Sequence, residues 1–241
     1  MENYLAWDYS GTPFELFGPA HLWFLAVFAG ICWSVLRAGA RGPEGERRFL
    51  RRLMVVLLVT NELSYHIWAL WYGHWTLDTM LPLHACSFIV WWMAWALWFD
   101  RRWMHGPIYY MGIAGAVQAL ITPDAGVYGF PHFRFFQTMI AHGLLVLGGI
   151  WVARIDGFRP TLRNLFGIFG ALNVYALVVY FANLAVGSNY LYVNGKPEVP
   201  SLIDLMPAWP WYIPMLEGLA LAFFVLLWLP YSRPRRVIPA A

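Results

Sequence analysis

The chain alternates between long apolar stretches and short polar ones along its whole length. Seven apolar stretches have the roughly 17–25 residues that a helix needs to cross about 30 Å of hydrocarbon. We expect helices at residues 20–37, 53–72, 82–99, 106–122, 135–153, 164–187 and 211–230. The pattern predicts an all-α, polytopic membrane protein in which residues 1–241 form a single transmembrane domain.

The composition agrees with this pattern. Hydrophobic residues make up 60% of the chain and charged residues only 12%, whereas soluble domains average about 25% charged residues. Residues 1–19 contain no Lys or Arg, so we expect no secretory signal peptide. Cys32 and Cys86 lie in or at the edge of different predicted helices, which indicates neither a disulfide framework nor a cysteine-based zinc site.

Basic residues are distributed unequally between the two sides of the predicted bundle. All but two of the 16 Lys and Arg residues fall on one side, and the exceptions are Arg134 and Lys196. Because cytoplasmic loops carry the excess of basic residues, we expect seven spans with the amino terminus outside and the carboxyl terminus inside a bacterial cell membrane. The net charge of +3 then reflects these loops and indicates no nucleic-acid partner.

Polar residues inside the predicted spans gather in the outer half of the membrane. Such groups are costly in lipid, so each is a candidate functional residue. They are Glu62, His66, His84, Cys86, Gln137, His142, Asn173, Tyr180, Asn183 and Glu217. We expect them to surround a polar cavity that opens toward the extracytoplasmic side.

Cys86 is the candidate nucleophile. The thiolate is the reactive form, and a helix amino terminus favours it. Pro82 is suited to a first helical turn, which places Cys86 near that terminus. His84 is only two residues away and faces another direction, so His142 is the better candidate base if helices 82–99 and 135–153 touch. A buried, unreactive thiol remains the alternative from the residues alone.

Several of the other polar residues have a structural alternative. Glu62 and His66 are four residues apart on one helix face and are equally suited to a structural ion pair. Asn173 and Asn183 are typical of interhelical hydrogen bonds. A metal or haem site at His66, His84, His132 or His142 would need a tight ligand spacing that the sequence lacks. We therefore expect no metal and no cofactor.

Four segments carry a family resemblance. They are residues 81–87 (LPLHACS), 120–124 (LITPD), 130–137 (FPHFRFFQ) with His142 and Gly143, and residues 189–217, which include NYLY, WPWY and Glu217. In these segments the chain resembles the YwaF-like family of bacterial integral membrane proteins, which is related to eukaryotic transmembrane protein 164. The resemblance implies a cysteine-dependent acyltransferase acting on phospholipids, with Cys86 as acyl acceptor and His142 as its base.

The predicted function is therefore a CoA-independent lipid transacylase or an acyl hydrolase. An outward-facing site excludes cytoplasmic acyl-CoA, so we expect a phospholipid acyl donor and a lipid or water acceptor. Amides near Ser87, or Asn173, would stabilise the oxyanion. The expected substrate-binding residues are Arg134, His132, Lys196, Tyr180 and Asn183, and the expected supporting residues are His84, Glu62, His66, Asn173, Gln137 and Glu217. The alternative is a transporter of a small polar solute.

Overall fold

The computed structural model describes residues 4–123, 126–197 and 202–232, and within these residues it contains helices and no strand. Asp124 and the basic residues Arg233, Arg235 and Arg236 lie outside the described part. The α-helices are α1 (Pro19–Arg41), α2 (Glu44–Trp71), α3 (Ala85–Trp98), α4 (His105–Ile121), α5 (Phe133–Arg154), α6 (Leu162–Val186) and α7 (Tyr212–Trp228). Short 3-10 helices are η1 (Arg102–Met104), η2 (Tyr190–Tyr192), η3 (Leu202–Leu205) and η4 (Leu229–Tyr231). The predicted all-α fold is confirmed.

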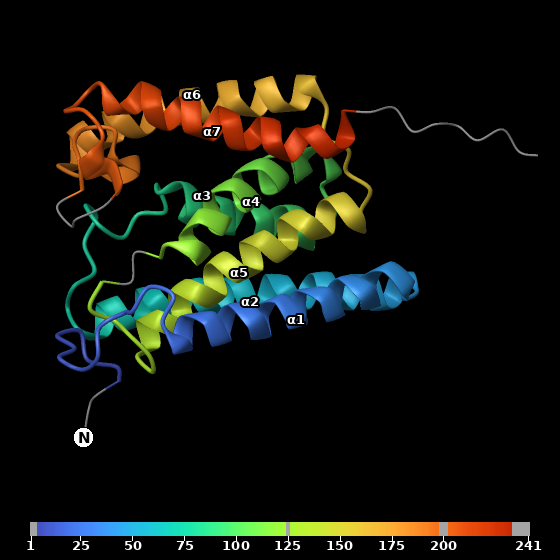
Figure 1. Cartoon of the computed structure of the whole chain (residues 1–241), viewed down its shortest axis with the longest axis horizontal. Helices are drawn as coiled ribbons and strands as arrows, with labels where there is room; N and C mark the ends of the chain where they lie inside the picture. The colour runs from blue at the N-terminus through green and yellow to red at the C-terminus, as the bar shows by residue number, and fades with distance from the viewer. Residues whose placement is uncertain (1–3, 124–125, 198–201, 233–241) are drawn as a thin grey trace, which may run out of the picture.

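Helix α5 lies at the centre of the bundle. It packs against α1, α2, α3 and α4, while α6 and α7 pair with each other and contact α4 (Figure 1). Small residues allow this close packing, as in many membrane bundles. A Cβ atom at Gly148 would collide with Met93 of α3, and one at Gly149 would collide with Ile113 of α4. The sequence of α5 thus lets two helices approach its backbone on adjacent faces.

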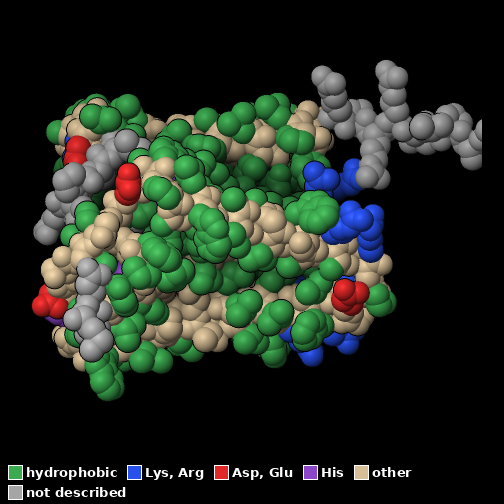
Figure 2. Space-filling view, turned by 60° about the horizontal axis from the view of Figure 1, so that its bottom comes forward, with side chains coloured by type: hydrophobic (Ala, Val, Ile, Leu, Met, Phe, Trp, Pro, Cys, Tyr) green, Lys and Arg blue, Asp and Glu red, His purple; other side chains and the backbone are tan. Residues whose placement is uncertain are grey.

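The outer surface of the bundle is apolar. Large hydrophobic side chains on α1, α6 and α7 are exposed, among them Trp23, Val174 and Leu226, and hydrophobic side chains cover much of the face that Figure 2 shows. Five helices, α1, α2, α5, α6 and α7 (the last continued through η4), are long and apolar enough to cross a membrane. These features are those of a multi-pass membrane protein.

Helix α3 is shorter than the sequence predicts. Helix α3 begins at Ala85 rather than 82 and has 14 residues, about 21 Å at 1.5 Å per residue, which is short for a span. Pro82 therefore precedes the helix instead of opening it. The backbone just before α3 is held by other groups, because Tyr190 Oη accepts from the Leu81 N–H at 2.7 Å and Tyr175 Oη donates to the Leu83 carbonyl at 2.9 Å. Helix α4 has 17 residues.

Helix α2 begins at Glu44 rather than 53, so most of the loop expected at 38–52 is helical. A hydropathy pattern identifies only the apolar part of a helix. The helix can extend beyond that part through turns of charged residues, provided that their side chains contact water or oppositely charged groups. Glu44 and Glu46 occupy the first turn, where carboxylates stabilise the positive end of the helix dipole. Except for Arg134, the described arginines lie at the end of α1, in the first turns of α2, between α3 and α4, and from the end of α5 to the start of α6. These segments meet at one end of the bundle, where Figure 2 shows basic side chains gathered. We call it the arginine-rich end.

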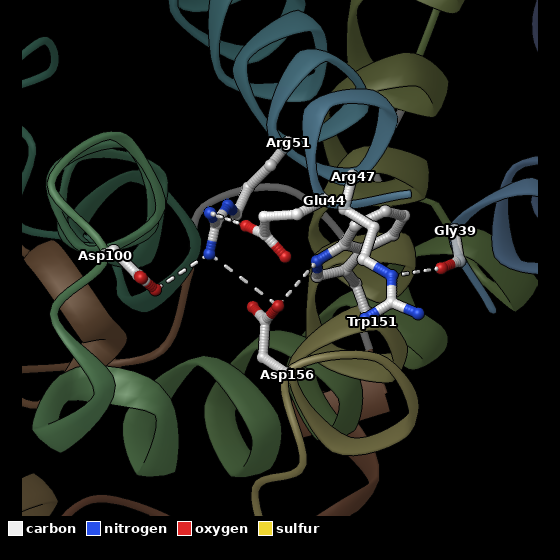
Figure 3. Close-up of polar contacts among 7 residues, drawn as sticks. All are labelled: Gly39, Glu44, Arg47, Arg51, Asp100, Trp151 and Asp156. Carbon is white, nitrogen blue, oxygen red and sulfur yellow. Dashed lines mark hydrogen bonds and ion pairs between the residues drawn. The ribbon is translucent and has the colours of Figure 1, made fainter. Parts of the chain in front are cut away.

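Arg51 is buried at the arginine-rich end, contrary to its expected place in a loop. Its Nη1 lies 2.7 Å from Asp100 Oδ1 and 3.7 Å from Asp156 Oδ1, and its Nη2 lies 3.7 Å from Glu44 Oε1 (Figure 3). The Trp151 indole N–H donates to Asp156 Oδ1 at 3.2 Å. Arg51, Glu44, Asp100 and Asp156 form a group that we call the Arg51 cluster. It joins the start of α2 to the α3–α4 and α5–α6 connections.

Candidate functional site

A cavity of about 480 Å³ lies at the end of the bundle opposite the arginine-rich end. It is formed by α2, the first turns of α3 and α5, the end of α4, and η2. Its lining residues are Glu62, Tyr65, His84, Ala85, Cys86, Ser87, Val90, Ala119, Arg134, Gln137, Thr138, Ala141, His142, Leu145, Leu191 and Tyr192. We call it the Cys86 cavity. It brings together residues that are up to 130 positions apart, as Glu62 and Tyr192 are (192 − 62).

Cys86 is the second residue of α3 and is partly exposed in this cavity. His84 is the N-cap residue of the helix, and Phe88 N–H donates to the His84 carbonyl at 2.9 Å. The preceding amides, those of residues 85–87, have no acceptor within the helix and lie in the cavity lining. Helix α4 lies close to the thiol, because a Cβ atom added at Gly115 would be 3.8 Å from the Cys86 sulfur, an ordinary van der Waals contact. Cys86 thus lines the cavity beside a small residue of α4, together with the other residues of the first turn of α3.

His142 lines the same cavity from α5. Its Nδ1 lies 2.8 Å from the Thr138 carbonyl oxygen. Because a carbonyl oxygen only accepts hydrogen bonds, Nδ1 carries the proton and Nε2 of the neutral ring keeps its lone pair. This tautomer is the one that a general base requires. Helices α3 and α5 are in contact, as a base on α5 for Cys86 requires.

Arg134 is a cation in the wall of the Cys86 cavity. Its guanidinium donates to Gln137 Oε1 and lies 4.0 Å above the centre of the Tyr65 ring. Asn61 donates to the Gln137 carbonyl at 3.0 Å and so fixes this turn of α5 to α2. Among the described residues Arg134 forms no ion pair within 4.0 Å, so its charge remains available to an anionic ligand.

Glu62 and His66 form the predicted pair on α2, with 3.8 Å between His66 Nε2 and Glu62 Oε1. The Trp75 indole N–H donates to His66 Nδ1 at 3.0 Å. An indole N–H can only donate, so the His66 proton is on Nε2 and points toward Glu62. Glu62 faces the Cys86 cavity, but His66 is not among its lining residues. His66 thus lies next to Glu62 outside the cavity lining.

Segment η2 covers one side of the cavity and is held by His84. The Leu191 N–H donates to His84 Nδ1 at 3.4 Å, and the His84 ring lies 5.2 Å from the Tyr190 ring and 5.4 Å from the Tyr192 ring. Leu191 and Tyr192 have φ values of 58° and 56°. Side chains disfavour this left-handed region by roughly 1–3 kcal/mol per residue. The surrounding contacts therefore impose an uncommon backbone on the wall of the cavity.

Two expected site residues lie in a second cavity. Asn173 of α6 and Glu217 of α7 line a space of about 170 Å³ between these helices, which we call the α6–α7 cavity. Asn173 donates to the Phe169 carbonyl at 3.0 Å. It is not among the residues that line the Cys86 cavity, so the structure places it away from the oxyanion role that we considered for it.

Four further expected residues are not among those that line the Cys86 cavity. Buried His132 caps α5 by accepting from the Arg134 N–H at 3.1 Å and contacts the Ala6 carbonyl through Nε2 at 3.0 Å, and burial lowers its pKa. Lys196 donates to the Met206 carbonyl at 2.8 Å. Buried Asn183 orders the following loop by contacts with the backbone N–H and carbonyl of Tyr190, both at 2.9 Å. Tyr180 is half-buried beside Phe181.

Two aromatic residues, Tyr65 and Tyr192, belong to the site although sequence reasoning gave them no role there. Tyr65 lies three residues after Glu62 on α2, so helical spacing from Glu62 was the available signal for it. Tyr192 lies in the short 3-10 helix η2 and had no such signal. Among the described residues, no group of three or more His, Cys, Asp or Glu side chains is arranged to hold a metal ion, and we assign no metal site.

An apolar helical bundle around a polar, one-ended cavity defines a multi-pass membrane protein with an internal site. The TMEM164 family model matches residues 16–228, and the chain belongs to this family. The match covers every α-helix of the bundle and therefore the whole Cys86 cavity. Neither the comparison with curated proteins nor that with solved structures gave a match.

Proposed function

We propose that the protein is a membrane acyltransferase or acyl hydrolase in which Cys86 is the nucleophile and His142 the base. One observation carries the proposal: Cys86 and the imidazole of His142, in the tautomer that leaves Nε2 free of its proton, line a single cavity. A nucleophile, a base oriented by a third group and nearby amide donors form the arrangement that covalent catalysis uses.

The first half of the reaction forms a thioester. His142 Nε2 takes the thiol proton, and the Cys86 sulfur attacks the ester carbonyl carbon of a phospholipid. The tetrahedral oxyanion lies near the amides of residues 85–87, whose N–H groups have no helical partner. The carbon–oxygen bond of the ester then breaks, and the lysolipid alkoxide leaves with the proton from His142.

The second half returns the thiol. A hydroxyl group of an acceptor lipid, or water, gives its proton to His142 and attacks the thioester carbonyl carbon. A new carbon–oxygen bond forms, the carbon–sulfur bond breaks, and the proton passes from His142 to the departing thiolate. Arg134 is suited to hold the phosphate of the bound lipid, because its guanidinium forms no ion pair within the described residues and offers several N–H donors.

We further propose seven membrane-crossing segments, with the Cys86 cavity facing the extracytoplasmic side of a bacterial inner membrane. The concentration of arginines at the other end supports this orientation, and α3 and α4 are then two of the seven segments. Acyl-CoA is cytoplasmic, so a phospholipid is the acyl donor in this arrangement.

The transporter alternative has less support. A solute path needs polar residues along its entire length, whereas Val90 and Leu145 already belong to the cavity wall. The following turns of α3 bring the buried apolar residues Met93 and Leu97. A cavity that ends on packed hydrophobic side chains favours chemistry inside it over passage through it.

The test is to trap the thioester. Purified protein in liposomes that contain acyl-labelled phospholipid is expected to acquire a hydroxylamine-labile label, and Cys86→Ala is expected to lose it. Cys32→Ala is the matched control, because Cys32 is buried in a separate cluster with Met54, Leu147 and Trp151, and it should label normally. A label that survives in Cys86→Ala, or no label in the wild type, refutes the mechanism, and solute flux that persists in Cys86→Ala supports transport instead.

A further inference from the structure

The α6–α7 cavity is built from matching stripes on its two helices. On α6 the stripe is Phe169, Leu172, Asn173 and Ala176, and on α7 it is Ile213, Leu216, Glu217 and Ala220. Both follow the spacing i, i+3, i+4, i+7, which puts all four side chains on one helix face. Each stripe ends in an alanine, and these small side chains leave space between two otherwise bulky faces. The residue pattern of both helices therefore produces the cavity.

Each stripe contains one polar residue, Asn173 on α6 and Glu217 on α7. Glu217 makes no hydrogen bond or ion pair with the described residues, although it stands among apolar side chains. The Asn173 amide donates within its own helix at 3.0 Å. A ligand that matches this lining has a hydrocarbon part for the apolar side chains and a hydrogen-bond-donating group, such as a hydroxyl or an ammonium, for the Glu217 carboxyl.

The α6–α7 cavity shares a wall with the Cys86 cavity. Leu191 and Tyr192 of η2 line both spaces, so the wall is no thicker than this one segment of backbone with its side chains. The same two residues carry the left-handed backbone, with φ values of 58° and 56°. A ligand seated between α6 and α7 therefore lies directly behind the segment that faces the thiol.

We infer that the α6–α7 cavity is the subsite for the acyl acceptor, a single-chain lipid whose ammonium group pairs with Glu217 and whose hydroxyl reaches past Leu191 and Tyr192 into the Cys86 cavity. This inference rests on the proposed function, because an acceptor is needed only after Cys86 has been acylated. The bound lipid supplies the hydroxyl for the second half of the reaction: its oxygen bonds to the thioester carbon, the carbon–sulfur bond breaks, and its proton passes through His142 to the thiolate. Two adjoining cavities let donor and acceptor occupy separate places.

Photolabelling tests occupancy without requiring any chemistry. The probe is a lysophosphatidylethanolamine, whose ammonium group can donate to the Glu217 carboxyl, with a diazirine in its acyl chain, applied in liposomes to the Cys86→Ala protein. Labelled peptides are expected from residues 169–176 and 213–220. Ala220→Trp, which fills the cavity, should reduce this labelling at least fivefold, whereas Leu219→Trp, at the exposed neighbouring position, should not. Equal labelling in the two variants overturns the subsite, as does stronger labelling by a diacyl phospholipid that carries the same diazirine.

Acyl-enzyme discharge tests the role of the subsite. In protein with Cys86 intact, Ala220→Trp and Glu217→Leu should form the thioester at the wild-type rate but pass it to added lysolipid at least tenfold more slowly, with hydrolysis by water unchanged. Leu219→Trp should discharge normally. Normal discharge in all three variants refutes an acceptor role. Absence of any thioester in the wild type refutes the proposed function instead, while the photolabelling result still decides whether the cavity binds a single-chain lipid.

Discussion

The two ends of the bundle both contain charged residues, but they use them differently. In the Arg51 cluster one arginine faces three carboxylates, with the closest contact at 2.7 Å. At the opposite end Arg134 rests 4.0 Å from the Tyr65 ring centre and pairs with no carboxylate among the described residues. The charge of Arg51 is satisfied within the protein, whereas that of Arg134 faces a cavity of about 480 Å³.

Helix α2 contributes a buried charged residue to each end of the bundle. Arg51 and Glu62 are eleven residues apart (62 − 51), about 16 Å along the helix axis. Both are nearly buried, with exposed fractions of 7% and 6%. Burial alone therefore does not distinguish a structural charge from a functional one. What distinguishes them is whether the facing elements supply opposite charges or an open space, and each prediction below tests this difference.

The largest effect is expected for His142→Ala. Removal of the base should slow formation of the Cys86 thioester by roughly 10²–10⁴-fold. The melting temperature should change little, because among the described residues the His142 ring hydrogen-bonds only to Thr138 of its own helix. Single-turnover labelling and thermal unfolding in detergent measure the two quantities. If the melting temperature of His142→Ala falls sharply together with its labelling rate, His142 has a structural role instead.

Arg51→Met is expected to reverse this pattern. It leaves three carboxylates near one another without their cation, and breaking a buried ion pair costs about 3–5 kcal/mol. Unfolding should occur at much lower denaturant concentration, while the folded fraction keeps its labelling rate. Arg52→Met is the matched control, because Arg52 is exposed, lies 5.4 Å from the centre of the Trp98 ring and forms no ion pair with a carboxylate in the part of the chain that the structure describes. Equal stability of the two variants would contradict a structural role for the cluster.

Arg134→Gln should act on substrate binding. Loss of a charged contact to phosphate is worth about 1.5–3 kcal/mol, so KM for the phospholipid should rise by roughly 10–100-fold, with kcat affected much less. Arg134→Lys should recover part of the loss by retaining the charge. An unchanged KM in Arg134→Gln would assign the guanidinium to helix packing against Tyr65.

The smallest effect concerns Asp156, which is outside the membrane-spanning helices. Burial raises the pKa of its carboxyl to about 6, although Arg51 and the Trp151 N–H act in the opposite direction. Between the unfolded value of about 4 and this value, the folded protein binds more protons than the unfolded one. Stability should therefore decrease as the pH rises from about 4 to 6 and level off above.

Asp156→Asn should flatten this pH dependence, and Asp100→Asn should not. Thermal unfolding measured from pH 4 to 8 gives the slopes. The two residues contact the same guanidinium, so a common slope in both variants would mean that the dependence arises elsewhere in the protein.

Much of the site was predictable because its signals are local. Helical spacing predicted the Glu62–His66 pair, and the position of His142 in its helix, slightly deeper than Cys86, made it the candidate base if the two helices touch. The length of α3 was not predictable in the same way. The backbone before its first residue accepts a hydrogen bond from the Tyr175 hydroxyl and donates one to the Tyr190 hydroxyl, and these tyrosines are about 90–110 positions later in the chain.

The sequence by itself determined that this is an all-α membrane protein with polar residues grouped near Cys86, because hydrophobic length and helical spacing are properties of contiguous residues. Only the tertiary structure decided which polar groups reach the cavity. Lys196 is bound to the Met206 carbonyl and His132 to the backbone of residues 6 and 134, whereas Arg134 remains available. The reason is physical: a polar side chain pairs with whichever unsatisfied group the packed helices bring near it, and helix packing depends on contacts between distant segments.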